Sequence, residues 1–161
     1  MDVYFLRHGL ADWPDWDPAH DDERPLTSNG VVRMKAEAKR LEQLGLKFDV
    51  ILTSPLKRAR QSAEIVARRL GGELVEDPAL APGFNETVVA AIVGRYPAAK
   101  AILLVGHEPD FGTTIGALIG GARIKLKRGG LARVETQWRE SGDLAGTLVW
   151  LLPPKWLTSD S

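Results

Sequence analysis

The chain has 161 residues with 21 basic and 21 acidic side chains, so its formal net charge is zero. This length suits one compact α/β unit, and the charge balance gives no global attraction for nucleic acid or an anionic membrane. The absence of cysteine excludes disulfides, thiolate catalysis and cysteine-ligated metal. No stretch has the length and apolarity of a membrane span, and the first residues lack the features of a signal peptide. We therefore expect a cytoplasmic protein with one domain over residues 1–161, in which residues 158–161 form a frayed tail.

The first third of the chain predicts a buried strand, a loop and a helix. The strand is the apolar run Val3 to Leu6. The loop runs from Leu10 to Pro25 and holds three prolines and six acidic residues. The helix has Thr27 or Ser28 as its N-cap and ends at Gly45. Its apolar face is formed by Val31, Met34, Ala38, Leu41 and Leu44.

A second strand and helix follow with the same order. Residues 50–52 form a buried strand, Ser54 is the expected N-cap, and Pro55 occupies the first helical position. This helix is predicted to end at Gly71. Its core side consists of Ala59, Ala63, Val66 and Leu70.

The rest of the chain continues the alternation of strands and helices. We expect a short strand over 73–76, a helix over 85–96, and a central strand over 101–105. A short helix then begins near Pro109 and closes at Gly120. Two last strands, 131–136 and 147–152, flank a turn and predict an antiparallel hairpin. The pattern favours a three-layer α/β/α fold with a mostly parallel sheet and an antiparallel edge.

Basic residues follow three of the predicted strands. Arg7-His8-Gly9 leaves the first strand, Ser54 to Arg58 leaves the second, and Gly106-His107-Glu108 leaves the central one. In an open α/β sheet, ligands bind outside the carboxyl ends of the strands. The three segments are therefore expected to converge on one rim.

These residue types suit phosphoryl transfer. Arginine offers paired planar donors to phosphoryl oxygens, so Arg7 and Arg58 are the predicted clamp, with His107 as a further donor. The helix predicted to start at Ser54 would direct free N–H groups toward the same anion. His8 is the better candidate nucleophile because it adjoins Arg7 and precedes Gly9, which would let the chain turn closely around a ligand.

Several of these residues also have simpler interpretations. A lone His107 is more often a packed structural residue, and Arg58 lies in a basic run that commonly forms a solvated helix face, the interpretation kept for Arg60 and Arg33. His20 stands among acidic residues without a metal-binding spacing, so an exposed acidic loop is favoured over a metal site. Trp13 and Trp16 could form a lid or partner surface, but packing of their loop onto the body is slightly favoured.

The motifs together resemble the histidine phosphatase superfamily, which has the phosphoglycerate-mutase-like fold. The resemblance covers Met1 to about Pro154 and is closest to the small SixA-type branch of phosphohistidine phosphatases. It rests on Arg7-His8-Gly9, Ser54-Pro55-Leu56, Arg58-Ala59, Gln61-Ser62, Gly106-His107-Glu108-Pro109 and the segment Arg24 to Gly30. It implies that His8 is phosphorylated, that Arg7, Arg58 and His107 complete the phosphate pocket, and that no metal or cofactor takes part. We also expect substrate contacts from Gly9, Ser54, Glu108 and Arg24.

The chain departs from the family at the general acid. Fuller members carry an acidic residue in the segment matching Asp77 to Gly83, and here the corresponding position holds Ala81. Glu108, Asp110 and Glu86 could replace it, but each is more often a cap or solvated residue. Expelling an alkoxide needs a positioned acid, whereas the imidazole of phosphohistidine can leave neutral once its ring is protonated.

The sequence therefore predicts a phosphatase that forms a phosphohistidine intermediate on His8 and acts on protein phosphohistidine. One alternative is a small-molecule phosphomonoesterase for a sugar or nucleotide-like phosphate. Another is a non-enzymatic phosphohistidine-binding module. The expected partner is a phosphorylated protein or small substrate, without nucleic acid or membrane, and the chain is expected to be a monomer or weak dimer.

Overall fold

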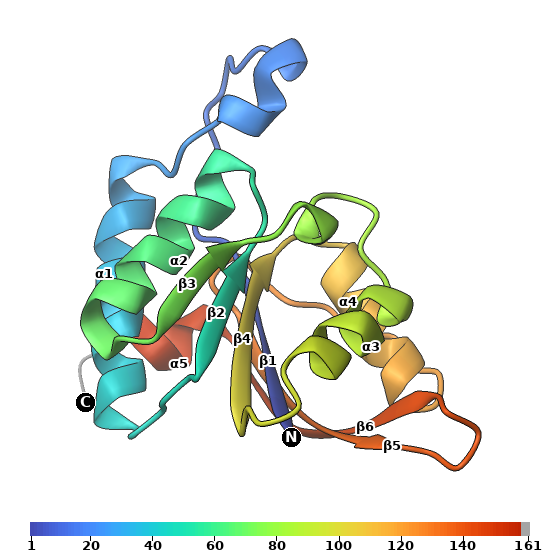
Figure 1. The fold of residues 1–161 in the computed structure, drawn as a ribbon. Helices are drawn as coiled ribbons and strands as arrows, with labels where there is room; N and C mark the ends of the chain where they lie inside the picture. Colours follow the sequence, from blue (N-terminus) through green and yellow to red (C-terminus); the bar gives the residue numbers. More distant parts are fainter. Residues whose placement is uncertain (159–161) are drawn as a thin grey trace.

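The sheet of a computed structural model, which describes residues 1–158, has six strands in the order β3-β2-β4-β1-β5-β6 (Figure 1). Four neighbouring strands are parallel, and the last two form an antiparallel hairpin at one edge. The mostly parallel sheet with an antiparallel edge is thus confirmed. The strands are β1 (Asp2–Arg7), β2 (Val50–Thr53), β3 (Glu73–Glu76), β4 (Ala101–Gly106), β5 (Leu131–Trp138) and β6 (Leu144–Leu152).

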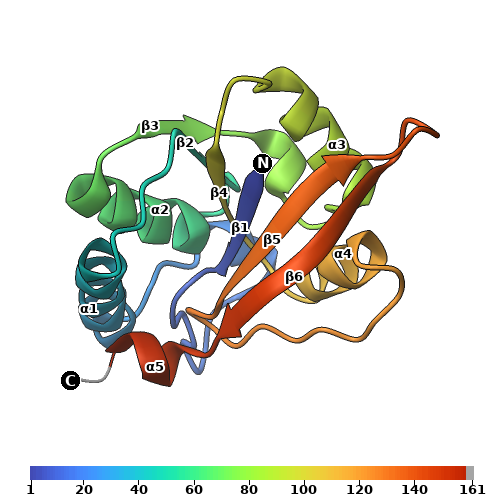
Figure 2. The same ribbon diagram turned by 90° about the horizontal axis from the view of Figure 1, so that it is seen from below.

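Helices cover both faces of the sheet, as the predicted three layers require (Figures 1 and 2). One face packs against α1 (Ser28–Gln43), α2 (Lys57–Leu70) and the short α5 (Pro154–Thr158). The other packs against α3 (Glu86–Arg95) and α4 (Asp110–Leu118). Successive strand residues point to opposite faces. Phe5 and Leu104 therefore join the core under α3 and α4, while Leu6 and Val105 join the core under α1 and α2.

The predicted helix starts are confirmed where a side chain caps the helix. The Oγ1 of Thr27 accepts a hydrogen bond from Gly30 N at 3.0 Å, so Thr27 is the N-cap of α1. The side chain of Asn85 caps α3 by accepting from the N–H groups of Thr87 and Val88. Each cap satisfies backbone donors that the first helical turn leaves free.

The predicted start of α2 is wrong. Its N-cap is Leu56, without a side-chain cap, and Pro55 precedes the helix. The Oγ of Ser54 instead accepts from Leu56 N at 3.2 Å within a turn, which delays the helix to Lys57. The helix α5 was not predicted. The expected frayed tail began at Thr158, which is the last residue of α5, and 159–161 lie outside the described residues.

The segment between β1 and α1 stands above the carboxyl ends of the strands, next to α2 (Figure 1). It contains the 3-10 helix η1 (Pro18–Glu23). The two tryptophans of this segment donate hydrogen bonds within it, Trp13 Nε1 to Pro25 O and Trp16 Nε1 to His20 O, both at 2.8 Å. A second 3-10 helix, η2 (Pro78–Leu80), follows β3. Trp13 remains 40% exposed, so its ring is only partly packed. Within residues 1–158, no helix combines the length and apolarity that a membrane crossing needs.

Candidate active site

Strand register brings three predicted site segments to one edge of the sheet. Arg7 pairs with Gly106 across β1 and β4, and Thr53 pairs with Val105 across β2 and β4. Backbone hydrogen bonds continue the register by one residue, from His8 N to Gly106 O and from Ser54 N to Val105 O. The residues that follow the three strands therefore meet, as expected for the carboxyl ends of parallel strands.

His8 is held in one tautomer by its two ring contacts. Its Nδ1 lies 2.7 Å from the carbonyl oxygen of Gly9, which can only accept, so Nδ1 carries the proton. Its Nε2 receives a hydrogen bond from Arg58 Nε at 3.3 Å. Burial, followed by the charges of His107, Arg58 and Arg7, lowers the pKa of His8 to about 3, although the Gly9 contact opposes this. A neutral His8 thus presents an unprotonated Nε2 at neutral pH.

His107 lies beside His8, with ring centroids 5.4 Å apart. Its Nε2 is 2.7 Å from Ser54 Oγ, so Ser54 contacts a predicted site residue directly. This hydroxyl also accepts the Leu56 N–H, and when it donates its own proton to Nε2, the ring proton of a neutral His107 lies on Nδ1. That Nδ1 is buried and has no hydrogen-bond partner among residues 1–158. Burial, then the nearby Arg58, lowers the pKa of His107 to about 4.

Arg58 and Arg7 enter the site from different elements. Arg58, in the first turn of α2, is buried and contacts both His8 and Asp21. Arg7 ends β1, and its Nη1 donates to Leu126 O at 2.9 Å, while its buried Nε has no partner among the described residues. Burial is the main factor that lowers the pKa of each guanidinium. Both still carry positive charge at neutral pH.

Glu108 and Arg24, predicted to contact substrate, are engaged by other groups. The Glu108 carboxylate accepts hydrogen bonds from Gly112 N and Leu126 N, so it caps the first turn of α4 and holds the residue whose carbonyl Arg7 contacts. Arg24 donates to Ala11 O and to the Asp21 carboxylate. Arg24 and Arg58 thus both contact Asp21. Glu108 instead stabilises the backbone of the segments that carry Gly112 and Leu126.

Gly9 is required by packing. A Cβ on Gly9 would lie 2.7 Å from Met34 Cγ, so its small size lets α1 approach the segment after β1. Its carbonyl orients His8, and its N–H donates to Ser62 Oγ at 3.0 Å. The buried Ser62 in turn donates to the Arg58 carbonyl at 2.8 Å. Ser62 therefore joins the His8 segment to the Arg58 segment.

Sequence reasoning assigned no role to Ser62 or Asp21. Ser62 was visible only as part of the Gln61-Ser62 element of the family resemblance. Asp21 was one acid among several in a predicted loop, and no pattern separated it from Asp22. Its contact with Arg58 depends on the path of the segment over α2, which local sequence does not encode.

The region expected to hold a general acid has none at Ala81, which ends the 3-10 helix η2. Asp110 accepts a hydrogen bond from Gly83 N at 2.8 Å, and Glu86 is exposed in the first turn of α3. His20 is exposed, with its Nε2 4.0 Å from Asp17 Oδ2 and its Nδ1 3.5 Å from Glu23 Oε2. Across residues 1–158 the acidic and histidine side chains form no group of three that could hold a metal ion.

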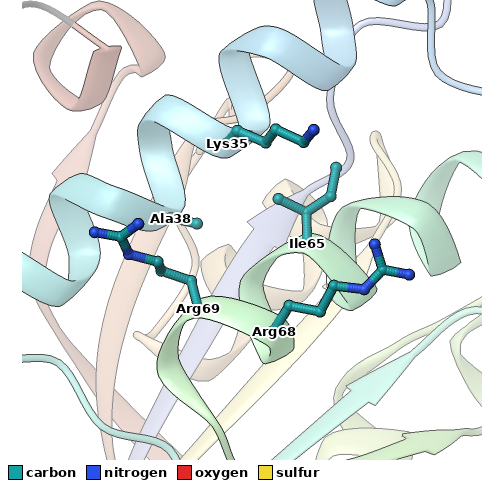
Figure 3. A pocket seen from close by; sticks show the side chains of 5 residues that line it. All are labelled: Lys35, Ala38, Ile65, Arg68 and Arg69. Atoms are coloured by element: carbon teal, nitrogen blue, oxygen red, sulfur yellow. The ribbon is translucent and has the colours of Figure 1, made fainter.

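A hollow of about 230 Å³ lies apart from these residues, between α1 and α2 (Figure 3). Cationic side chains surround its apolar floor, and one of them, Arg69, pairs with Glu42 at 2.6 Å. None of the predicted site residues lines it. Its lining residues are Lys35, Ala38, Ile65, Arg68 and Arg69.

The family model of the histidine phosphatase superfamily (branch 1) matches residues 3–83, which include His8 and Arg58. The chain belongs to this superfamily. An uncharacterized protein of Picosynechococcus sp. is 41% identical over 98% of this chain and 99% of its own length. Phosphohistidine phosphatase SixA of Escherichia coli is 29% identical over 96% of this chain and 94% of its own.

Solved structures agree with the superfamily assignment. The structure of the protein histidine phosphatase SixA complexed with tungstate matches with a TM-score of 0.82 and 29% identity, covering 98% of this chain and 99% of that one. The predicted phosphoglycerate-mutase-like fold is therefore confirmed. A 2,3-bisphosphoglycerate-dependent phosphoglycerate mutase of Bartonella henselae is 34% identical over only 48% of this chain and 40% of its own. The chain is thus similar both to a phosphatase, over almost its whole length, and to a mutase, over about half of it.

Proposed function

We propose that this superfamily member hydrolyses phosphohistidine on a protein substrate through a covalent phosphohistidine on His8. The observation that carries the proposal is the pair of contacts that the His8 ring makes, from which its tautomer follows. Its Nδ1–H is bound to Gly9 O, and its Nε2 is unprotonated and in contact with Arg58. A histidine nucleophile needs an unprotonated attacking nitrogen; Nε2 of the neutral ring meets this need once the Arg58 N–H passes from it to a phosphoryl oxygen.

In the first step, Nε2 of His8 bonds to phosphorus while the bond from phosphorus to the substrate nitrogen breaks. The other ring nitrogen of the substrate takes a proton from solvent before the bond breaks, so the imidazole leaves neutral with the electron pair of the P–N bond. In the second step, water oxygen bonds to phosphorus, the electron pair of the P–N bond returns to His8 Nε2, and phosphate departs with the remaining proton released to solvent. No step requires the expulsion of an alkoxide, which agrees with Ala81 at the position of the family's acid.

Arg7, Arg58 and His107 are the proposed phosphoryl contacts. Charge on the equatorial oxygens grows during transfer, and fixed donors stabilise it. Arg7 Nε and His107 Nδ1 are both buried without a partner among residues 1–158, and a phosphoryl oxygen would satisfy each of them. Ser54 would act indirectly, by holding the ring of His107.

The substrate class is inferred from the relatives and from the missing acid. SixA, similar over almost the whole chain, is named a phosphohistidine phosphatase, and its solved complex contains tungstate, an oxyanion. The mutase match is confined to about half of this chain. It nevertheless favours a small phosphomonoester as the second candidate substrate.

We also propose that the chain forms one domain, since both hydrophobic cores lie on the same sheet.

The test compares phosphate release from a phosphohistidine-carrying protein with release from a panel of small phosphate esters, for wild type and His8→Ala. We expect kcat/KM for phosphohistidine to exceed that for the esters by roughly 100-fold, the scale of a missing general acid. The His8→Ala variant should release no phosphate from either. Faster turnover of an ester would establish the second candidate. Binding of the phosphoprotein without turnover would indicate the binding module.

A further inference from the structure

Asp21 places a carboxylate between two arginines at the edge of the candidate site. Its Oδ2 accepts from Arg58 Nη2 at 3.1 Å, and its Oδ1 accepts from Arg24 Nε at 3.2 Å. The backbone carbonyl of Asp21 also accepts from Arg58 Nη1 at 2.8 Å. Together with the contact to His8, every nitrogen of the Arg58 guanidinium is engaged.

The Asp21 carboxylate occupies donors on Arg58 that an anionic ligand would use. The Arg58 side chain is only 7% exposed, while the Asp21 side chain is 51% exposed and reaches in from η1. Burial raises the pKa of Asp21, but Arg58 and Arg24 outweigh it and hold the pKa below its usual value. Asp21 is therefore ionised at neutral pH. A carboxylate and a phosphoryl group both use paired oxygens to bind a guanidinium, so both would seek the same donors.

We infer that Asp21 is an internal anion that competes with the phosphoryl group for Arg58. This inference rests on the proposed role of Arg58 as a phosphoryl contact. A phosphoryl group that takes the Arg58 N–H groups must displace the Asp21 carboxylate or share the guanidinium with it. Every phosphoryl ligand, free phosphate included, meets the cost of this displacement. Asp21 thus weakens binding of the product phosphate and favours its release.

The neighbouring acids of η1 provide a control. Asp22 is adjacent in sequence and exposed, and neither arginine contacts it in the described structure. Asp22→Asn changes the net charge by the same amount as Asp21→Asn. A general field effect of the acidic segment would act similarly in both variants and would weaken with salt, whereas direct competition at Arg58 is specific to Asp21.

The experiment measures the affinity of wild type, Asp21→Asn and Asp22→Asn for inorganic phosphate by calorimetry, without turnover. Removing one charged competitor is expected to tighten phosphate binding roughly tenfold in Asp21→Asn and by less than about twofold in Asp22→Asn. Asp21→Glu, which keeps the charge, should bind phosphate within about threefold of wild type. Asp21→Ala serves as the second variant if the amide disturbs folding, and circular dichroism checks all of them.

Weaker phosphate binding in Asp21→Asn and Asp21→Ala would overturn the inference, since it would show that Asp21 positions Arg58 for the anion. An equal gain in Asp22→Asn would overturn it as well. The result is independent of the substrate class. If wild type fails to hydrolyse phosphohistidine but Asp21→Asn still binds phosphate more tightly, the proposed function fails and the competition stands.

Discussion

The Nε of Arg58 lies 3.3 Å from the Nε2 of His8, the nitrogen proposed to attack phosphorus. The same N–H that holds the lone pair in the free protein must release it when attack begins. A phosphoryl oxygen can then take the donor in place of His8. Arg58 therefore serves both the nucleophile and the transferred group, through one planar guanidinium.

Replacing Arg58 by lysine tests whether this planar geometry matters. A lysine keeps the charge but offers one compact ammonium, which cannot bond His8 and an oxyanion with the same orientation. We expect kcat/KM for phosphohistidine to fall roughly 100- to 1,000-fold, as when a preorganised donor is lost. Arg60→Lys is the matched control and should retain activity, because Arg60 is half-exposed on α2 and pairs with Glu64 and Glu76. Near-normal turnover by Arg58→Lys would show that only charge is needed.

Ser62→Ala tests the hydrogen bonds that join the His8 segment to the Arg58 segment. The substitution leaves the Gly9 N–H without its partner in a buried position, which should cost about 1–3 kcal/mol of unfolding free energy. Because Gly9 orients His8, kcat should fall while KM changes little. Urea unfolding and steady-state kinetics measure the two effects. Unchanged kcat in a destabilised variant would make Ser62 purely structural.

The two buried histidines determine how the folded protein responds to acid. Burial lowers the pKa of His8 to about 3 and that of His107 to about 4, against about 6.5 for an unfolded histidine. Between pH 6.5 and 3 the unfolded chain binds protons that the native one does not, so the unfolding free energy falls as the pH is lowered. Both rings should stay neutral at pH 5.5 in the folded protein. Nitrogen NMR shifts of the imidazoles check this, and titration of His8 near pH 6.5 would contradict it.

Glu37 on α1 is a buried carboxyl group whose Oε2 has no partner among residues 1–158. Burial raises its pKa to about 9, although Arg33 opposes this. From pH 4.5 to 9 the native chain holds a proton that the unfolded chain has lost, so stability falls as pH rises through this range. Glu37→Met removes this cost and should stabilise the protein at pH 8 by roughly 1–3 kcal/mol. Denaturant unfolding at pH 5 and pH 8 measures it; an equal change at both values would point to packing instead.

Much of the fold could be predicted from where apolar residues recur along the helices and from the unbroken apolar runs of the strands. The unbroken apolar runs at β1, β2 and β4 require burial on both faces, and this fixes a parallel sheet with its loops at a common edge. The convergence of His8, Arg58 and His107 follows from that topology. Their types and positions after the strands were readable without coordinates, whereas their catalytic roles stay a prediction.

The remainder depends on contacts between distant segments. Ser54 resembles an N-cap locally, but its hydroxyl lies next to His107, 53 residues away, and the helix starts later. Glu108 was predicted to contact substrate, but its carboxylate accepts hydrogen bonds from two backbone N–H groups, one of them 18 residues away. Asp21 could not be chosen from its acidic segment because the pairing with Arg58 arises from how that segment passes over α2.

The central claim is that His8 accepts the phosphoryl group on Nε2. The most direct measurement is 31P NMR and mass spectrometry of the protein after brief exposure to a phosphohistidine-carrying protein and quenching at alkaline pH. We predict one acid-labile phosphoryl group on Nε2 of His8, absent from His8→Ala. A phosphoryl group on another residue, or continued phosphate release by His8→Ala, would contradict the account.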